Sequence, residues 1–300
     1  MILGRISSII VSGGYKSGYH VCAVDVLIGE QCSFTQVPKL PKSIYNSSMV
    51  VHNGTILLCG GFSNEKKCLQ LDHGTWKEHS TLNVERVDHS AVTTQTATFL
   101  FGGEHSRTTY EYLPRGSTKW RMGKTEIPGG SMSGCAIAVN SEKEIWLIGG
   151  ESTEKRILCF SVKNHSFQDL RFQLITGRQG HRCAYIPNTN KIMISGGYIQ
   201  GYGYGYLNST EIIDVRNGCI SSASPMNSKR HQHGMGIVTI NDEDKLVAFG
   251  GNRYMHTWLD CVEVYNTKTR KWENTDVKLK APKTSFGFLN VKLDQIISKL

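Results

Sequence analysis

Six Gly-Gly pairs, each at the end of a short apolar run, constrain the fold of this chain more than any other feature. The runs read IIVS, ILLC, TFLF, IWLI, IMIS and LVAF, and the pairs begin at Gly13, Gly60, Gly102, Gly149, Gly196 and Gly250. Successive pairs are 42 to 54 residues apart, and a period of this length is typical of repeat architectures. Glycine is accordingly abundant, with 31 of 300 residues against an average of roughly 7%.

The stretch between two pairs keeps a constant order of features. A polar loop is followed by an alternating strand such as 261–265, then by a turn and usually an aromatic residue. A loop with Arg, Lys or His comes next, and then a strand of small and branched residues such as 90–93. Four antiparallel strands repeated six times, without a long helical period, predict an all-β fold, a six-bladed β-propeller that forms a single domain over residues 1–300.

The spacing of the Gly-Gly, Tyr and Trp residues resembles the kelch repeat. Tyr112 to Trp120 and Tyr265 to Trp272 match the late half of that repeat. The early half is resembled by three Arg-x-x-His motifs: Arg86-x-x-His89, Arg178-x-x-His181 and Arg230-x-x-His233. The resemblance covers nearly the whole chain and implies a kelch-type propeller. In many relatives such a ring recruits substrates to a cullin ubiquitin ligase through separate BTB and BACK domains, and neither domain occurs in these 300 residues.

The two ends of the sequence predict how the ring closes. The first repeat begins at its second strand, around residues 6–12, and one strand, 286–291, is left over after Trp272. Pairing the C-terminal strand with the N-terminal blade completes that blade and removes an open sheet edge.

Most of the repeated residues have a structural interpretation. We expect the glycine pairs to turn the backbone where a Cβ would clash or φ is positive. None of the pairs continues into a phosphate-binding motif. The aromatic residues that recur once per repeat, Trp76, Trp120 and Trp272 among them, should pack between neighbouring blades.

Strand direction places the Gly-Gly loops and the loops that enter the next blade at the same mouth of the central channel. This mouth is rich in Arg, His and Tyr, residue types that favour binding, and the net charge of the chain is +9, which favours an acidic partner. We therefore predict a protein-interaction module that binds a protein or peptide there. The predicted partner-binding residues are Arg86, Arg178, His181, Arg182, Arg230, His233, Tyr202, Tyr204, Tyr206, Arg253 and Tyr254. An alternative role for the Arg-x-x-His motif is a hydrogen bond that holds the blade-entry loop.

Two alternative functions are compatible with the sequence. A mutarotase-like sugar-modifying enzyme could use Glu104, Glu151, Arg178 and His181, and a secreted recognition domain is the second alternative. We expect a non-enzymatic protein with no cofactor, no metal site and no membrane partner. The chain carries no nucleic-acid-binding motif, so nucleic acid is a disfavoured partner. A ubiquitin-ligase or cytoskeletal assembly is compatible with the fold.

The compartment depends on the cysteines and on the N-terminus. The start of the sequence shows no signal peptide, which predicts a cytoplasmic protein, or an extracellular one if the N-terminus is incomplete. Cys59 and Cys68 flank a strand–loop–strand connection. They form either a disulfide, which would support an extracellular location, or two buried thiols.

Overall fold

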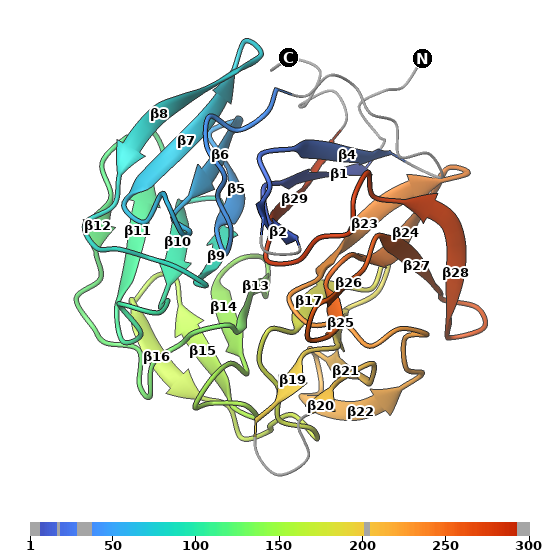
Figure 1. The fold of residues 1–300 in the computed structure, drawn as a ribbon. Helices are drawn as coiled ribbons and strands as arrows, with labels where there is room; N and C mark the ends of the chain where they lie inside the picture. Colours follow the sequence, from blue (N-terminus) through green and yellow to red (C-terminus); the bar gives the residue numbers. More distant parts are fainter. Residues whose placement is uncertain (1–6, 17–18, 29–37, 201–204, 293–300) are drawn as a thin grey trace.

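The computed structural model is a ring of six antiparallel sheets arranged radially around a central channel (Figure 1). It describes residues 7–16, 19–28, 38–200 and 205–292. The described residues contain strands and turns but no helix. This confirms the predicted six-bladed β-propeller, and no helix in this part of the chain is long and apolar enough to cross a membrane.

Each blade uses its first strand at the channel and its last strand at the rim. The first blade contains β29 (Gly287–Lys292), β1 (Ser7–Ser12) and β4 (Val24–Ile28). The second contains β5 (Ser48–His52), β6 (Thr55–Cys59), β7 (Lys67–Asp72) and β8 (Thr75–Thr81), and the third β9 (Ser90–Thr93), β10 (Ala97–Phe101), β11 (Tyr110–Pro114) and β12 (Arg121–Met122). The fourth contains β13 (Cys135–Val139), β14 (Glu144–Ile148), β15 (Ile157–Ser161) and β16 (Ser166–Asp169).

The last two blades, like the first, contain an additional hairpin. The fifth blade contains β17 (Arg182–Tyr185), β18 (Lys191–Ser195), β21 (Thr210–Asp214) and β22 (Cys219–Ala223), and the sixth β23 (Gly234–Ile240), β24 (Glu243–Phe249), β27 (Cys261–Asn266) and β28 (Lys271–Lys278). Three two-stranded hairpins follow Gly-Gly pairs: β2 (Tyr15–Lys16) with β3 (Tyr19–His20), β19 (Tyr198–Ile199) with β20 (Gly205–Tyr206), and β25 (Asn252–Tyr254) with β26 (Thr257–Trp258).

The predicted closure of the ring is confirmed. β29 pairs with β1 in an antiparallel register that runs from Ser7 opposite Lys292 to Ser12 opposite Gly287. The innermost strand of the first blade therefore comes from the C-terminal end of the chain, and its second strand comes from the N-terminal end. Figure 1 shows β29 beside β1. The closing ladder removes the open edge that β1 would otherwise present at the channel.

The hydrophobic core lies between blades in six separate clusters. Trp120 of the third blade packs with Leu57 of the second, and Trp272 of the sixth packs with Met193 of the fifth. Both indole rings are buried. The expectation that the recurring tryptophans fill the space between neighbouring blades is therefore confirmed for these two, and Trp76 packs partly buried against the cluster between the first and second blades.

The glycine pairs hold each blade against the loop that enters the next one. Both residues of every pair have positive φ, a conformation that only glycine adopts at low cost. In all six pairs the second glycine donates its N–H to a carbonyl of that entry loop, over 2.7 to 3.0 Å. The accepting residues are Ile44, Arg86, Ser131, Arg178, Arg230 and Lys283. A Cβ on Gly102 would lie 1.8 Å from the Ser131 carbonyl oxygen.

Gly102→Ala is therefore expected to be more destabilising than Gly54→Ala, a matched glycine in a surface turn. Gly54 has φ +75°, and a Cβ added there would meet no atom within 4 Å, so its replacement costs only the backbone term of about 1–2 kcal/mol. Gly102→Ala adds a clash with backbone atoms, for a further loss of about 1–3 kcal/mol. Urea unfolding of both variants measures the difference. Equal losses would show that the close approach at Gly102 carries no cost.

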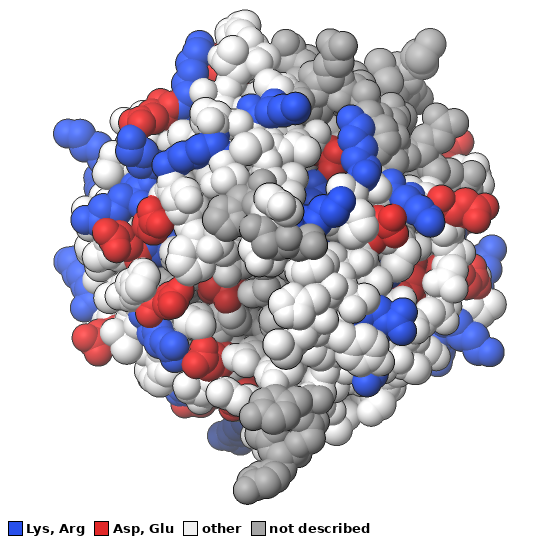
Figure 2. All heavy atoms as spheres, in the orientation of Figure 1, with Lys and Arg blue, Asp and Glu red and all other residues white. Residues whose placement is uncertain are grey.

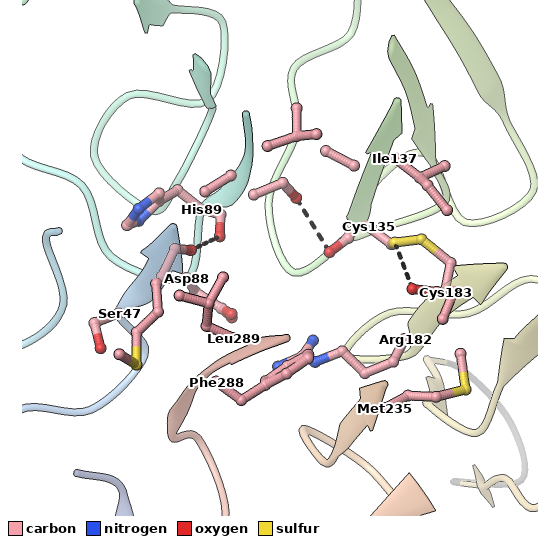
Figure 3. A pocket seen from close by; sticks show the side chains of 18 of the residues that line it. Ser47, Asp88, His89, Cys135, Ile137, Arg182, Cys183, Met235, Phe288 and Leu289 are labelled. Carbon is pink, nitrogen blue, oxygen red and sulfur yellow. Dashed lines mark hydrogen bonds between the residues drawn. A yellow bond between two sulfur atoms is a disulfide. The ribbon is translucent and has the colours of Figure 1, made fainter. Parts of the chain in front are cut away.

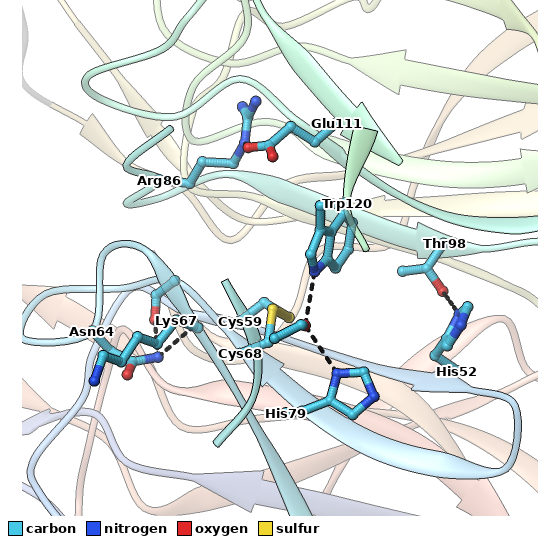
Figure 4. Close-up of a disulfide and its surroundings, with 12 residues drawn as sticks. His52, Cys59, Asn64, Lys67, Cys68, His79, Arg86, Thr98, Glu111 and Trp120 are labelled. Carbon is cyan, nitrogen blue, oxygen red and sulfur yellow. Dashed lines mark hydrogen bonds and ion pairs between the residues drawn. A yellow bond between two sulfur atoms is a disulfide. The ribbon is translucent and has the colours of Figure 1, made fainter. Parts of the chain in front are cut away.

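Among the described residues, four cysteines form two disulfides. Cys59 on β6 and Cys68 on β7 are directly opposite in the strand register, with Cα atoms 4.1 Å apart, and they are bonded (Figure 4). Cys135 on β13 and Cys183 on β17 join the innermost strands of the fourth and fifth blades, with Cα atoms 6.1 Å apart. The first pairing is one of the two alternatives that the sequence left open, and the second was not predicted.

Candidate functional site

The Gly-Gly loops and the entry loops lie on one face of the ring, which we call the hairpin face because it carries the three additional hairpins. Isolated β-bridges join the two kinds of loop: Tyr45 to Phe62, Gln179 to Tyr198, His231 to Asn252 and Tyr15 to Thr284. The loops that strand order assigns to one mouth therefore do meet in space.

The predicted role of the three motif arginines in binding a partner is wrong. Arg86, Arg178 and Arg230 are completely buried, so no partner can reach their guanidinium groups. The sequence suggests a surface position for them because Arg is usually exposed. The alternative interpretation, a hydrogen bond that holds the entry loop, is the one that the structure supports.

Each buried arginine joins its entry loop to two places in the blade that follows. Arg86 pairs with Glu111 on β11 over 2.9 Å and donates to the Gly102 carbonyl over 2.7 Å (Figure 4). Arg178 makes the equivalent contacts with Glu211, over 2.6 Å, and Gly196, over 2.8 Å. Arg230 makes them with Glu263, over 2.9 Å, and Gly250, over 2.7 Å. The motif arginine therefore fixes the glycine pair and the third strand of its blade together.

The first blade uses a variant of this pair, and two blades dispense with it. Lys283 occupies the arginine position before the first blade and forms a buried ion pair with Asp25 on β4. In the second blade the two positions hold Ile44 and Leu69, and in the fourth they hold Ser131 and Leu158. The cation and the carboxylate are thus present together or absent together, as expected when either charge alone would be buried without a partner.

The predicted binding role of the motif histidines is also wrong. His181 and His233 are completely buried. Burial lowers the pKa of His181 to about 3, and it lowers the pKa of His233 well below its usual value. Both imidazoles are therefore neutral at neutral pH, and Nε2 of His233 lies 2.9 Å from the Ser195 hydroxyl. These side chains fill space behind the glycine pairs rather than face a partner.

The residue immediately before each motif histidine belongs to a closed ring of hydrogen bonds around the channel, which we call the entry ring. One residue from each entry loop donates its backbone N–H to the carbonyl of the corresponding residue in the preceding blade's entry loop, over 2.6 to 3.2 Å. All six have φ between 48° and 60°. The entry ring consists of Asn46, Asp88, Ser133, Gly180, Gln232 and Ser285. It ties all six blades together at the hairpin face.

Three predicted residues do come together at the surface. Tyr206 on β20 and Tyr254 on β25 stack edge to face with centroids 6.1 Å apart. The guanidinium of Arg253 lies 5.4 Å from the Tyr254 ring centre, and the ammonium of Lys229 lies 5.7 Å from it. Tyr254 is 47% exposed. Tyr202 and Tyr204 lie outside the described residues, and Arg182 lies in the channel rather than on this surface.

Further aromatic rings continue from this group around the face. Tyr15 contacts both Tyr45 and Trp258, with centroids 6.0 and 6.1 Å apart, and Tyr45 stacks on Phe62 at 4.6 Å. Two neighbouring side chains, Tyr19 and Met255, are 77% and 75% exposed. We call this set of rings, together with Tyr206, Lys229, Arg253 and Tyr254, the basic aromatic arc. It extends over the fifth, sixth, first and second blades.

Charge is distributed unevenly over the hairpin face. Carboxylates are scarce in one part of this face, which comprises the described glycine-pair loops of the fifth, sixth and first blades and the entry loops 38–47, 224–233 and 279–286. Asp260 is the one carboxylate among these described residues, and it is only partly exposed. The same loops carry Lys16, Lys39, Lys42, Lys229, Arg253 and Lys280. The glycine-pair loops of the second to fourth blades contain charges of both signs, with Glu65, Glu104, Glu151 and Glu154 beside Lys66, Arg107, Lys155 and Arg156. Figure 2 shows a largely uncharged surface over the β19–β20 and β25–β26 hairpins, with Lys and Arg side chains at its upper border.

A comparison with family models places the chain. Residues 88–297 match the model described as the KLHDC2/KLHL20/DRC7 Kelch-repeats domain. The chain belongs to this kelch-repeat family. No curated protein matches the sequence significantly. Among solved structures, the one titled "Structure of YjhT" is similar to this kelch chain, with a TM-score of 0.69 and 12% sequence identity over 84% of this chain and 89% of the other. This similarity shows the fold alone.

Proposed function

We propose that this kelch propeller is a protein-interaction module that binds an acidic segment of a protein partner on the basic aromatic arc. The observation that carries the proposal is Tyr254, an exposed ring with both Arg253 and Lys229 within 6 Å of its centre. It lies in a part of the face with one carboxylate among the described loop residues. Tyr and Arg dominate binding hot spots because each combines a large contact area with a polar or charged tip.

The arrangement favours an acidic partner for two physical reasons. Lys229 and Arg253 lie in loops where carboxylates are scarce among the described residues, so their combined field attracts a negatively charged segment. The rings offer an apolar surface beside these cations, so a segment with alternating acidic and apolar residues satisfies both. The net charge of +9 supports the same direction of attraction.

A pair of matched double variants tests the proposal. Lys229→Ala/Arg253→Ala removes two cations from the arc, and Lys163→Ala/Lys268→Ala removes two exposed cations from β-turns on the opposite face. The arc variant should bind a fluorescein-labelled Glu-rich peptide at least about tenfold more weakly in fluorescence anisotropy, because hot-spot residues contribute at least about 1–2 kcal/mol each. The control should bind like the wild type. Equal affinities of the two variants would refute the location of the site.

The sugar-modifying alternative is less favoured by the positions of its residues. Arg178 and His181 are buried in their blade interfaces, whereas Glu104 is exposed, so the four residues proposed for that activity are not gathered at one surface. We therefore propose a binding role without catalysis. A ubiquitin-ligase or cytoskeletal assembly stays a proposal for the partner. The two disulfides support the alternative of an oxidising, extracellular compartment over the cytoplasm.

A further inference from the structure

The central channel contains a cavity of about 380 Å³ with one positive and one negative side chain. The innermost strands of the blades and part of the entry ring line it. Arg182 is the one Lys or Arg among its described lining residues, and Asp88 is the one Asp or Glu. Figure 3 shows the two side chains extending into the channel from different sides, with Phe288 and Leu289 between them.

Arg182 keeps part of its hydrogen-bonding capacity unused. Nη1 donates to the His181 carbonyl over 3.0 Å, whereas the buried Nε has no protein partner among the described residues. The guanidinium lies 5.6 Å from the centre of the Phe288 ring. Burial lowers the pKa of this side chain and Asp88 raises it. The half-buried guanidinium therefore has donor capacity to spare for an anion that enters the channel.

Asp88 is held in place but is not paired with Arg182. Its carboxylate accepts a hydrogen bond from the Ser133 hydroxyl, and its backbone is part of the entry ring. Burial raises the pKa of Asp88, while the Ser133 hydrogen bond and the charge of Arg182 lower it. The two side chains thus influence each other, yet Arg182 is absent from the ion pairs within 4.0 Å that the described residues form. Neither charge is therefore neutralised by a direct ion pair with the other.

The remaining walls combine apolar side chains with polar ones such as Ser48, Ser90 and Asn290, and one end of the channel reaches solvent. Phe288, Leu289, Ile137 and Met235 line the cavity. On β29, Gly287 near the entry ring is buried, whereas Asn290, further along the strand, lines the cavity and is exposed. The channel therefore opens away from the entry ring, on the face opposite the basic aromatic arc.

We propose that this cavity binds a small zwitterion, an α-amino acid with an apolar side chain. Its carboxylate would accept from Arg182, its ammonium would donate to Asp88, and its side chain would contact Phe288 and Leu289. A simple carboxylate would meet the charge of Asp88, and a simple amine would meet that of Arg182. Only a ligand with both charges satisfies both groups. This site shares no residue with the proposed partner surface.

Isothermal titration calorimetry of the wild-type chain with three related molecules tests this proposal. L-leucine should bind, whereas 4-methylpentanoate, which lacks the ammonium, and 3-methylbutylamine, which lacks the carboxylate, should bind at least about tenfold more weakly. The absence of saturable leucine binding, or equal binding of leucine and 4-methylpentanoate, would overturn the proposal.

Two variants then assign the charges. Asp88→Asn keeps the entry ring, because Asn46 occupies the equivalent position with φ 54° against 56° for Asp88. This variant should lose its preference for leucine over 4-methylpentanoate, and Arg182→Gln should lose its preference for leucine over 3-methylbutylamine. A general loss of structure would weaken the binding of all three molecules and would not remove one preference while keeping the other. Lys229→Ala/Arg253→Ala should bind leucine normally, so failure of the partner site and failure of the channel site are distinguishable. Unchanged preferences in folded Asp88→Asn would refute the assignment.

Discussion

Arg230→Ala is expected to lower the free energy of unfolding by about 3–5 kcal/mol, because it leaves a buried carboxylate without its cation. Glu263 is completely buried and accepts hydrogen bonds from the backbone N–H groups of Asn227 and Ser228, over 2.6 and 3.0 Å. These contacts hold the carboxylate in place after Arg230 is removed. The Gly250 carbonyl loses its arginine donor as well. Urea denaturation followed by circular dichroism measures the loss.

The double variant Arg230→Ile/Glu263→Leu is the informative control. It installs in the sixth blade the residues that the second blade has at the same positions, Ile44 and Leu69. Removing both charges avoids the uncompensated carboxylate, so the double variant should be more stable than Arg230→Ala. A double variant that is as unstable as the sum of its two single changes would show that the charges do not act as a pair.

The burial of the motif arginines determines which variants can be used to study partner binding. Alanine variants of Arg178 or Arg230 would weaken binding by destabilising the propeller, whatever surface the partner uses. Arg253, which is exposed, reports on the surface without that complication. The distinction follows from burial alone: the three motif arginines are 0% exposed.

The sequence predicted the parts of this fold that depend on local chain geometry. Each blade needs positive φ at two successive residues, which favours a glycine pair, so the number of pairs predicts the number of blades. The additional strand at the C-terminus predicts how the ring closes. Burial of the motif arginines depends instead on a carboxylate some 25 to 33 residues further along. A signal for it was present: Glu111, Glu211 and Glu263 stand where Leu69 and Leu158 are found in the other blades.

The candidate site was predicted in part for a similar reason. Tyr206, Arg253 and Tyr254 were found because they lie on loops that local strand order assigns to one face. Their mutual packing could not be predicted, because it depends on how far the β19–β20 and β25–β26 hairpins lean toward each other. Arg182 follows a buried histidine at the start of an innermost strand, and only the closed ring determines that its side chain lies in the channel.

Deleting residues 284–300 should abolish the cooperative unfolding transition rather than shift it by a few degrees. The deletion removes β29, so all six residues of β1 lose their partners on that side, and β1 becomes an open edge paired only with β4. It also removes Phe286, whose ring stacks on Phe249 of the sixth blade with centroids 5.7 Å apart, and Ser285 of the entry ring. The first and sixth blades would then be joined across the gap by neither a sheet nor the ring of hydrogen bonds.

A shorter deletion separates this closure from an effect of chain length. Removing only residues 293–300 retains the whole β29–β1 ladder, so that variant should keep a cooperative transition in thermal circular dichroism. The same measurement on the 284–300 deletion should show a broad, non-cooperative loss of signal and binding of a dye that recognises exposed apolar surface. A propeller distributes its core over separate interfaces between blades. Opening one interface exposes both of its faces to solvent, and the remaining blades are then no longer held in a closed ring. Wild-type-like melting of the 284–300 deletion would mean that five complete blades hold together without the closing strand.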